Sequence, residues 1–426
     1  MPKTKFFLAA ACLFGSSALL NAATIFPTSP LIQIGDDTDI FFSGSLAFDY
    51  KDNLFSVADK KSAMLLTFTP GFEIEYAKDS PLSINVSAAR SFLRYNKSEY
   101  KDLEEGQDNI SGSIYYDTGG PLTVKLFSAY NESARNDNLA NALGGDGAIL
   151  GATLVRQALH THDLKVAYKL TEKISVNVGF INSYNHYLNP IKTTTTVSGL
   201  PDVAYNTNTL SEINTKSIPI NITYTTPSDK LVYGLSFKHD VSNYSPAPYF
   251  HTYNGSSVSR PPLSQKMTQD FYGFTVDGQP TSSGKIHITT RFGYFNADLD
   301  GVATNGASYN LKISHNLTER FTHELSLSHE LTPGTTGGTL KTDTLIYSGI
   351  YALSEKFSLN FSVIKTWSDT GSSQVDVLDL RAGANWEYNK YFKMSAYVDT
   401  LDSKVKNTPS NDYKANSFNI TSTLRY

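Results

Sequence analysis

Residues 64–76 read Met-Leu-Leu-Thr-Phe-Thr-Pro-Gly-Phe-Glu-Ile-Glu-Tyr, and this stretch decides the fold. Apolar side chains stand at every second position from Met64 to Tyr76, mostly with small or charged residues between them. A period of two is the pattern of a β-strand with one apolar and one polar face. Strands in soluble sheets average about five or six residues, whereas a tilted membrane-spanning strand needs about 9–11. The stretch therefore predicts a strand that spans a membrane.

The same alternation recurs along the rest of the chain, for example in residues 174–180, 218–224, 286–294 and 357–363. It predicts an all-β fold, a transmembrane antiparallel up-and-down β-barrel of about 18 strands. Loss of one hairpin would leave 16, and an even number keeps both chain ends on the periplasmic side. A soluble β-sandwich explains the alternation but not so many long strands. The predicted strands are 39–50, 62–77, 82–95, 109–117, 122–130, 153–169, 174–187, 214–225, 231–240, 267–277, 285–297, 306–316, 321–331, 342–353, 357–367, 375–388, 391–400 and 414–426.

The connections between these strands are short at one end and long at the other. Three nearly identical heptapeptides, Tyr168–Ile174, His315–Phe321 and Tyr351–Phe357, each run from an aromatic or His residue through turn formers to an apolar one. They predict tight periplasmic turns beside rings at the membrane interface. The long, polar stretches are 96–107, 131–152, 189–213 and 241–266. This asymmetry is typical of outer-membrane barrels.

The N-terminus resembles an export signal. Lys3 and Lys5 precede an apolar segment from Phe6 to Leu20, which is short for a membrane span. We expect a signal peptide over 1–23, a periplasmic segment over 24–38 and the barrel over 39–426. The only cysteine, Cys12, lies in the signal segment and allows a lipoprotein alternative. A mature chain without thiols avoids mispairing in the oxidising periplasm. The predicted location is the outer membrane of a Gram-negative bacterium.

Composition and motifs exclude several classes of function. The chain has 36 basic and 40 acidic residues, which leaves no basic footprint for nucleic acid. No Gly-x-Ser-x-Gly elbow or glycine-rich phosphate loop occurs. His160 and His162 share one strand face, but no third metal ligand follows in sequence, which favours a structural role. We therefore predict no enzyme, no catalytic residue, no cofactor and no metal.

Alternation also predicts which side chains face the lumen, because charge is costly on the lipid side. Arg90 and Arg94 break the rule, since they share a face with Ile84 and Val86. Either a bulge at residues 88–89 turns them inward, or they lie above the hydrocarbon. The predicted inward residues comprise seven basic and six acidic groups. So many ionised groups suit a water-filled lumen, and their near-balance predicts no strong charge selectivity. The predicted inward ionisable residues are Glu73, Glu75, Lys125, Lys165, Arg291, Lys312, Glu324, Asp379, Arg381, Glu387, Lys393, Asp399 and Arg425.

The third outer loop, residues 131–152, is polar at first and then small and apolar. Apolar residues gain nothing in water, so we expect the loop to fold into the barrel. Glu132, Arg135 and Asp137 would then face the narrowest point of the channel, and deleting residues 138–147 would raise its conductance. The alternative is a strand that continues outward beyond the membrane.

The C-terminal strand carries an alternating apolar face. Phe418, Ile420, Leu424 and the terminal Tyr426 lie on that face. A last strand ending in an aromatic resembles the signal that the barrel-insertion machinery reads. The expected partners are that machinery and the lipid bilayer of the outer membrane. A homotrimer is expected only by analogy with porin-like barrels.

Residues 34–41 (Ile-Gly-Asp-Asp-Thr-Asp-Ile-Phe), Gly44, residues 50–55 (Tyr-Lys-Asp-Asn-Leu-Phe) and 69–71 (Thr-Pro-Gly) resemble the β-barrel porin type 2 family. The resemblance covers about 40 residues and implies a porin-like outer-membrane barrel. Asp52 and Asn53 fall where the first outer loop begins, which favours a turn-forming role. Lys51 stands where many relatives have a second Asp, which weakens an inference of cation binding.

The predicted strand number favours a channel. Barrels of about 16–18 strands leave an aqueous lumen, whereas eight-stranded barrels are filled by side chains. We expect a porin for the passive diffusion of small hydrophilic solutes. One alternative is a barrel for exopolysaccharide export or surface assembly, because some members of the resembling family are encoded near exopolysaccharide genes. Another is a structural or adhesive barrel, and an enzyme comes last.

Overall fold

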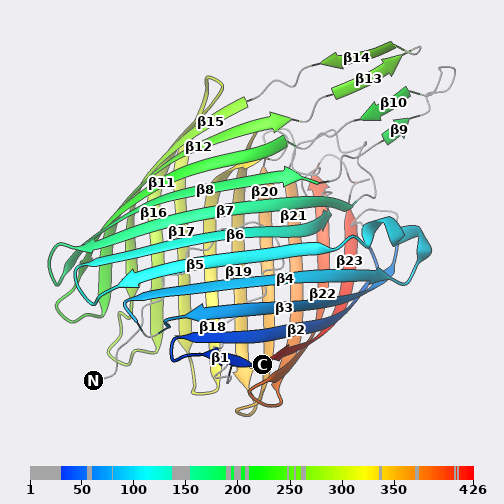
Figure 1. The fold of residues 1–426 in the computed structure, drawn as a ribbon. Helices are drawn as coiled ribbons and strands as arrows, with labels where there is room; N and C mark the ends of the chain where they lie inside the picture. Colours follow the sequence, from blue (N-terminus) through cyan, green and yellow to red (C-terminus); the bar gives the residue numbers. More distant parts are fainter. Residues whose placement is uncertain are drawn as a thin grey trace.

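The computed structural model describes residues 30–54, 60–78, 80–136, 154–188, 193–195, 203–206, 211–246, 249–253, 256–260, 265–334, 338–369, 374–406, 409 and 412–426. The predicted signal peptide lies outside these residues. Each strand pairs antiparallel with its neighbours in sequence order, and the last pairs with the first, which closes an 18-stranded barrel (Figure 1). The fold class and the strand number of 18 are confirmed.

The barrel strands are longer on the outer side than the alternation alone indicates. Two of them, 82–95 and 174–187, have the predicted bounds, but the fifth and the ninth continue six residues further. Polar residues still pair there, although no lipid imposes the alternation. The barrel strands are β2 (Thr38–Lys51), β3 (Ala63–Tyr76), β4 (Leu82–Tyr95), β5 (Gln107–Asp117), β6 (Leu122–Asn136), β7 (Leu154–Lys169), β8 (Ile174–Tyr187), β11 (Ser211–Thr225), β12 (Leu231–Pro246), β15 (Gln265–Gly278), β16 (Ile286–Leu299), β17 (Val302–Asn316), β18 (Phe321–Gly334), β19 (Gly338–Ala352), β20 (Phe357–Asp369), β21 (Gln374–Glu387), β22 (Phe392–Lys406) and β23 (Tyr413–Arg425).

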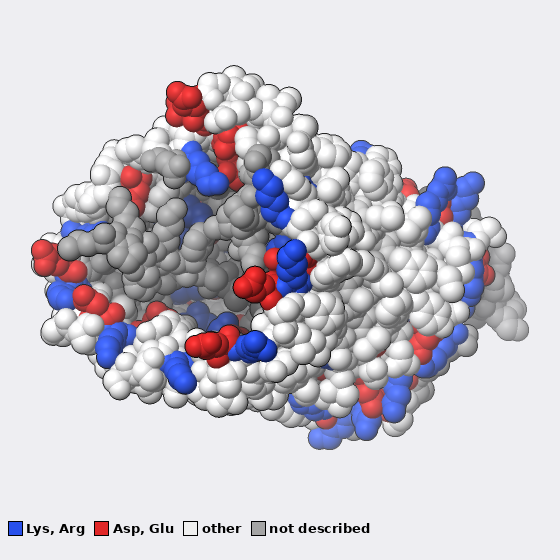
Figure 2. Space-filling view, turned by 90° about the horizontal axis from the view of Figure 1, so that it is seen from below, with Lys and Arg blue, Asp and Glu red and all other residues white. Residues whose placement is uncertain are grey.

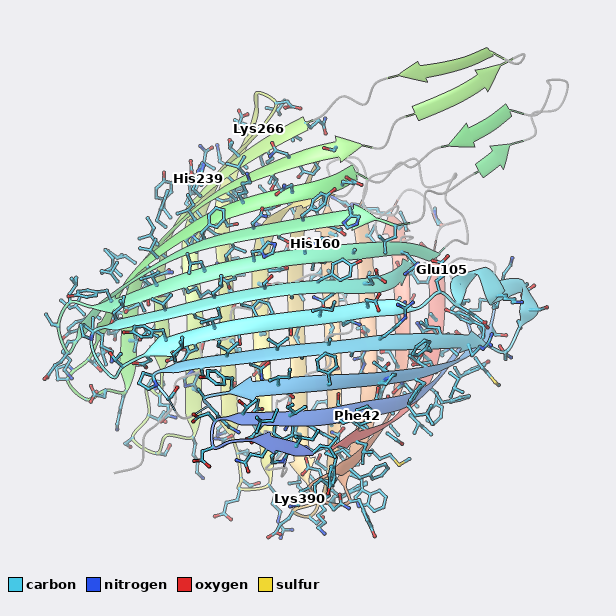
Figure 3. The ribbon with its side chains drawn as sticks, in the orientation of Figure 1. Phe42, Glu105, His160, His239, Lys266 and Lys390 are labelled. Carbon is cyan, nitrogen blue, oxygen red and sulfur yellow. The ribbon has the colours of Figure 1, made fainter. Side chains whose placement is uncertain are left out.

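The outward face carries an apolar band that ends in rings at the periplasmic rim. Trp386 packs edge-on against Tyr388, and Tyr391 lies 5.0 Å from Tyr426 between ring centroids. Figure 3 places Lys390, in the turn after β21, at the end of the barrel opposite Glu105. An aromatic girdle of this kind is usual at a membrane interface. Further exposed large residues of the band include Phe42, Leu66, Phe68, Phe72, Tyr168, Leu235, Phe274, Phe292, Leu345, Leu359 and Val398.

The repeated heptapeptide has a structural explanation in its fourth residue. The hydroxyls of Thr171, Thr318 and Ser354 each accept a hydrogen bond from the backbone N–H of the apolar residue that opens the next strand, at 3.0–3.1 Å. A side-chain oxygen that takes the place of a backbone carbonyl closes a turn without extra residues. The repeat therefore encodes the tight periplasmic turn.

The chain ends share one position in the wall. Tyr426 exchanges two backbone hydrogen bonds with Phe42, and β23 ends there. The short strand β1 (Ile32–Ile34) pairs with residues 38–40 of β2, on the edge that β23 leaves free. Both run antiparallel to β2, so β1 continues the line of β23 beside the C-terminus (Figure 1). Residues 32–34 of the predicted periplasmic segment are therefore part of the barrel wall.

The turn that joins β1 to β2 depends on Gly35. Its φ is +64°, a left-handed conformation that side chains with a branched Cβ disfavour. We expect Gly35→Val to lower the free energy of unfolding by about 1–2 kcal/mol, the usual cost of this conformation. Gly35→Asn is the control, because Asn adopts it readily. Urea titration of the protein in lipid vesicles would measure both, and equal losses for Val and Asn would contradict the explanation.

Two of the long outer loops contain strands that the alternation did not predict. β9 (Thr193–Thr195), β10 (Val203–Asn206), β13 (Tyr249–Tyr253) and β14 (Ser256–Arg260) form a separate four-stranded sheet in the order β14-β13-β10-β9. Figure 1 shows it beyond the ends of β8, β12 and β15. A 3₁₀-helix, η1 (Ser98–Leu103), lies between β4 and β5. Within the described residues, no helix has the length and apolar character of a membrane span.

Candidate functional site

The lumen wall is the candidate functional site. In each ladder, directly paired residues point to the same side, so the exposed apolar residues identify the outward face. Seen from below the view of Figure 1, the molecule is hollowed, and acidic and basic side chains lie around the hollow (Figure 2). Small polar groups cover much of the inward face. Ser87 and Ser111 share a hydrogen bond of 2.7 Å, and Thr69 and Ser91 share one of 2.9 Å.

The inward face carries more acidic than basic residues. Every predicted lumen residue whose side chain is described, except Glu132, lies on this face. The predicted near-balance was wrong, because carboxylates at or near the ends of the predicted strands, or where the alternation is interrupted, were not assigned to the lumen. The additional inward groups are Asp39, Asp49, Lys51, Asp117, Asp163, Lys169, Lys238, Asp240, Asp277 and Glu330, which brings the described total to thirteen acidic and ten basic.

The excess of carboxylates is confined to the five strands around the closure, β21, β22, β23, β2 and β3, which we call the acidic sector. The other thirteen strands are balanced among their described side chains, with six carboxylates and six basic groups. The carboxylates of the acidic sector are Asp39, Asp49, Glu73, Glu75, Asp379, Glu387 and Asp399, and its basic residues are Lys51, Arg381, Lys393 and Arg425.

Each arginine of the acidic sector is shared between two carboxylates. Arg425 lies 2.9 Å from Glu73 and 3.0 Å from Glu75, and its guanidinium covers the ring of Phe41 at 4.0 Å. Further up the wall, Arg381 lies 4.0 Å from Asp379 and 3.5 Å from Asp399. One guanidinium neutralises only one carboxylate. At the first position Lys78, in the turn after β3, lies 3.1 Å from Glu75 and balances the second carboxylate. A carboxylate in excess of the arginine therefore remains only beside Arg381.

In the remaining wall most basic groups have their own carboxylate. The distances are 2.6 Å for Lys165–Asp163, 2.8 Å for Lys238–Asp240, 3.2 Å for Arg291–Glu330 and 2.8 Å for Lys312–Glu324. Lys125 is different. It stands directly across from Lys165, and no carboxylate of the described residues lies within 4 Å of its ammonium group.

An aromatic ring lies flat on the wall between two glycines. Phe271 is 5% exposed although it faces inward, and its ring fills the positions where Gly273 and Gly293 would carry a Cβ atom. Arg291 covers the other face of the ring at 4.8 Å. Glycines that let an aromatic ring lie against the backbone are a known device of β-sheets. The arrangement keeps a large side chain out of the lumen.

The third outer loop begins later than predicted. β6 continues to Asn136, so alternation places Glu132 on the outward face. There Glu132 lies 2.9 Å from Arg156 and accepts a hydrogen bond from the hydroxyl of Tyr130. Its predicted role at the constriction was wrong, because the strand continues where a loop was assumed. The side chain of Arg135 and the whole of Asp137 lie outside the described residues.

Arg90 and Arg94 lie on the outward face. The register between β3 and β4 is the same on both sides of Pro70, so the proposed bulge is absent from this described pair. Arg90 stands opposite Asp108 at 3.3 Å, and Arg94 lies 2.7 Å from Glu104. The second alternative, a position above the hydrocarbon, accounts for both. Pairing with a carboxylate, on the next strand for Arg90 and after η1 for Arg94, makes each charge tolerable at the outer interface.

The two histidines of β7 share the outward face, as their spacing predicts. The ring of His160 lies 4.8 Å from Tyr130 and 5.2 Å from His186 (Figure 3), and His162 shares a hydrogen bond with Ser128 at 2.9 Å. No group of three or more potential metal ligands occurs among the described residues. His160, Tyr184 and His186 form a stacked cluster on the outer surface, which His162 does not join.

The residues of the Asp-Asn motif tie the first outer loop to the closing strand. Asn53 is 2% exposed, and its amide donates to the carbonyl of Lys414 at 3.1 Å. Asp52 accepts two hydrogen bonds from Asn416 and one from Lys60. Burial alone would raise the pKa of the Asp52 carboxyl, but these partners hold it below its ordinary value. The geometry fits the turn-forming role.

The comparisons support the fold. No family model and no curated protein matches the chain. Among solved structures, it is similar to the ferric citrate transporter FecA in its unliganded form, with 9% identity, a TM-score of 0.50, and coverage of 86% of this chain and 60% of that one. It also matches the siderophore receptor PiuA from Acinetobacter baumannii, at 10% identity over 91% and 82% with a TM-score of 0.47. OmpT, an outer membrane protein of Vibrio cholerae, matches at 11% identity over 93% and 100%, with a TM-score of 0.40. The likeness to FecA supports an outer-membrane β-barrel fold.

Proposed function

We propose that this chain is an outer-membrane channel through which small hydrophilic solutes diffuse passively. The observation that carries the proposal is the 18-stranded barrel with a polar, ionised inward face. Barrels of about 16–18 strands leave an aqueous channel, whereas 22-stranded transporters hold a plug. Hydroxyl groups and paired charges suit a wall in contact with water, and we assign no catalytic step to them.

The proposed location is the outer membrane of a Gram-negative bacterium. The outward apolar band and the rings at the periplasmic rim support contact with a lipid bilayer. Export would use the signal peptide over 1–23, and assembly would use the insertion machinery acting on β23. The resemblance to porin-like barrels supports the same assignment.

Conductance in planar bilayers tests the proposal. Full-length protein purified from outer membranes is expected to add stepwise, steady conductance that rises with salt concentration. Heat-unfolded protein at the same concentration is the control. Swelling of liposomes in sugars of increasing size would then give the size limit. Folded, membrane-inserted protein that adds no conductance would contradict the channel.

The four-stranded sheet beyond the barrel favours a second candidate, a structural or adhesive barrel that binds surface partners. β9 and β10 come from one loop and β13 and β14 from another, and Tyr205 pairs with His251 across the two hairpins. Two loops joined in this way present an ordered edge outside the membrane. A folded barrel that adds no conductance in planar bilayers would support this second candidate.

A further inference from the structure

We infer that the channel prefers cations, and that the preference arises in the acidic sector. The inference rests on the proposed function, because it concerns which solutes cross an open lumen. The carboxylates of this sector outnumber its basic groups by seven to four, whereas the rest of the described wall is balanced. The excess negative charge therefore lies on one side of the lumen.

The sharing of Arg381 between two carboxylates explains why the charge of the acidic sector is not cancelled locally. Arg381 stands between Asp379 and Asp399, with its guanidinium 5.0 Å from the ring centroid of Tyr397. On β2, which β23 separates from β22, Asp49 accepts a hydrogen bond from the neutral amide of Asn419 at 2.5 Å. Asp379, Asp399 and Asp49 thus lie within four consecutive strands of the wall and have one arginine, Arg381, among them.

Because the rest of the wall is balanced in charge, the acidic sector determines the preference for cations. There the carboxylates of Asp163, Asp240 and Glu324 each lie within 3 Å of a lysine on the same or an adjoining strand. Paired groups of opposite charge have little effect on an ion that passes several ångströms away. An unpaired negative charge attracts cations over about one Debye length, which is about 10 Å at 0.1 M salt and about 3 Å at 1 M. A cation route along the acidic sector follows.

The reversal potential of the full-length protein in a KCl gradient tests the inference. At about 0.1 M salt the potential is expected to have the sign of potassium permeation, and the preference should weaken towards about 1 M because of screening. A potential of zero or of opposite sign in an otherwise conducting channel would overturn the inference alone. A folded protein that does not conduct would instead contradict the proposed function.

Two substitutions of the same charge on β21 locate the effect. Asp379→Asn removes an inward carboxylate and is expected to lower the ratio of potassium to chloride permeability by about twofold, the change for one elementary charge roughly 10 Å from the ion in water. Asp376→Asn is the matched control, because Asp376 faces outward and pairs with Lys365 at 3.8 Å. Equal effects of the two variants would place the preference outside the lumen wall and overturn the assignment.

A third variant gives a change in the opposite direction. Arg381→Gln removes the shared cation and is expected to increase the preference for potassium, while the single-channel conductance shows that the barrel still opens. An unchanged or lower preference in this conducting variant would contradict the role of the sector. Heat-modifiable mobility on gels shows for each variant that the barrel has folded.

Discussion

Replacing Phe418 and Tyr426 together by serine is expected to remove most of the folded barrel from the outer membrane. β23 is the strand that closes the barrel, because it pairs with β22 on one side and with β2 on the other. Both rings face outward and are 36% and 46% exposed to the lipid side. Burial of such a side chain in an apolar environment contributes about 1.5–3 kcal/mol. The double variant therefore weakens closure, and it also removes the proposed assembly signal.

Two measurements separate these effects. Heat-modifiable barrel in isolated outer membranes measures assembly in cells, and refolding of purified protein into detergent measures stability alone. If the insertion machinery reads β23 as a signal, the loss of folded barrel should be larger in cells than in refolding into detergent. Tyr388→Ser is the matched control, because Tyr388 is 56% exposed at the same rim but lies outside the closing strand. Normal amounts of folded barrel in the double variant would refute the prediction.

Gly293→Val is expected to have the second largest effect. A Cβ atom at Gly293 would lie 2.4 Å from the ring of Phe271 and 2.4 Å from the backbone oxygen of Tyr272. Neither the wall nor the ring has room for it, so Phe271 must swing into the lumen. Overpacking of this kind costs about 1–3 kcal/mol. Urea unfolding in vesicles is expected to show that loss, and the displaced ring is expected to lower the single-channel conductance.

Gly112→Val is the control for strand propensity, since a Cβ at Gly112 meets its nearest neighbour at an ordinary 3.7 Å. Adding Phe271→Ala to Gly293→Val should restore most of the conductance, because the ring is no longer there to block the lumen. Wild-type stability in the single variant would show that the wall adjusts at no cost. Conductance that stays low in the double variant would show that Phe271 is not the obstruction.

The sequence predicted the strands well because lipid and water impose a period of two on every one of them. The segments 82–95 and 174–187 agree to the residue, since a turn former bounds each on the periplasmic side and a polar loop on the other. The same rule places Glu73, Arg291 and Asp379 on the inward face. Alternation shows which face of the wall a residue lies on, however, and not its position along the barrel axis.

The wrong assignment of Glu132 and the open assignment of Arg90 both arise because the position along the barrel axis was not known. Glu132 was assigned to a loop because no apolar alternation continues beyond Tyr130, yet the polar residues up to Asn136 still pair in β6. For Arg90 the sequence left two alternatives, a bulge that turns it inward and an outward position above the hydrocarbon; Asp108 on the next strand makes the outward position tolerable. Such a partner is 18 positions away in sequence, and only the register of β4 and β5 brings the two together. Matching Arg90 with Asp108 as a cross-strand charge pair would have decided between the two alternatives, whereas no apolar alternation indicates that β6 continues to Asn136.

The end-to-end arrangement of β23 and β1 has a consequence for the covalent order of the chain. Tyr426 pairs with Phe42 and Ile32 pairs with Ile40, so one residue, opposite Phe41, would complete a continuous strand. Leu31 already precedes Ile32 in the chain. A peptide bond between Tyr426 and Leu31 would therefore join the two pieces without altering any pairing. We therefore expect the barrel to tolerate circular permutation at this point, and new termini opened in an outer loop would leave every strand of the wall intact.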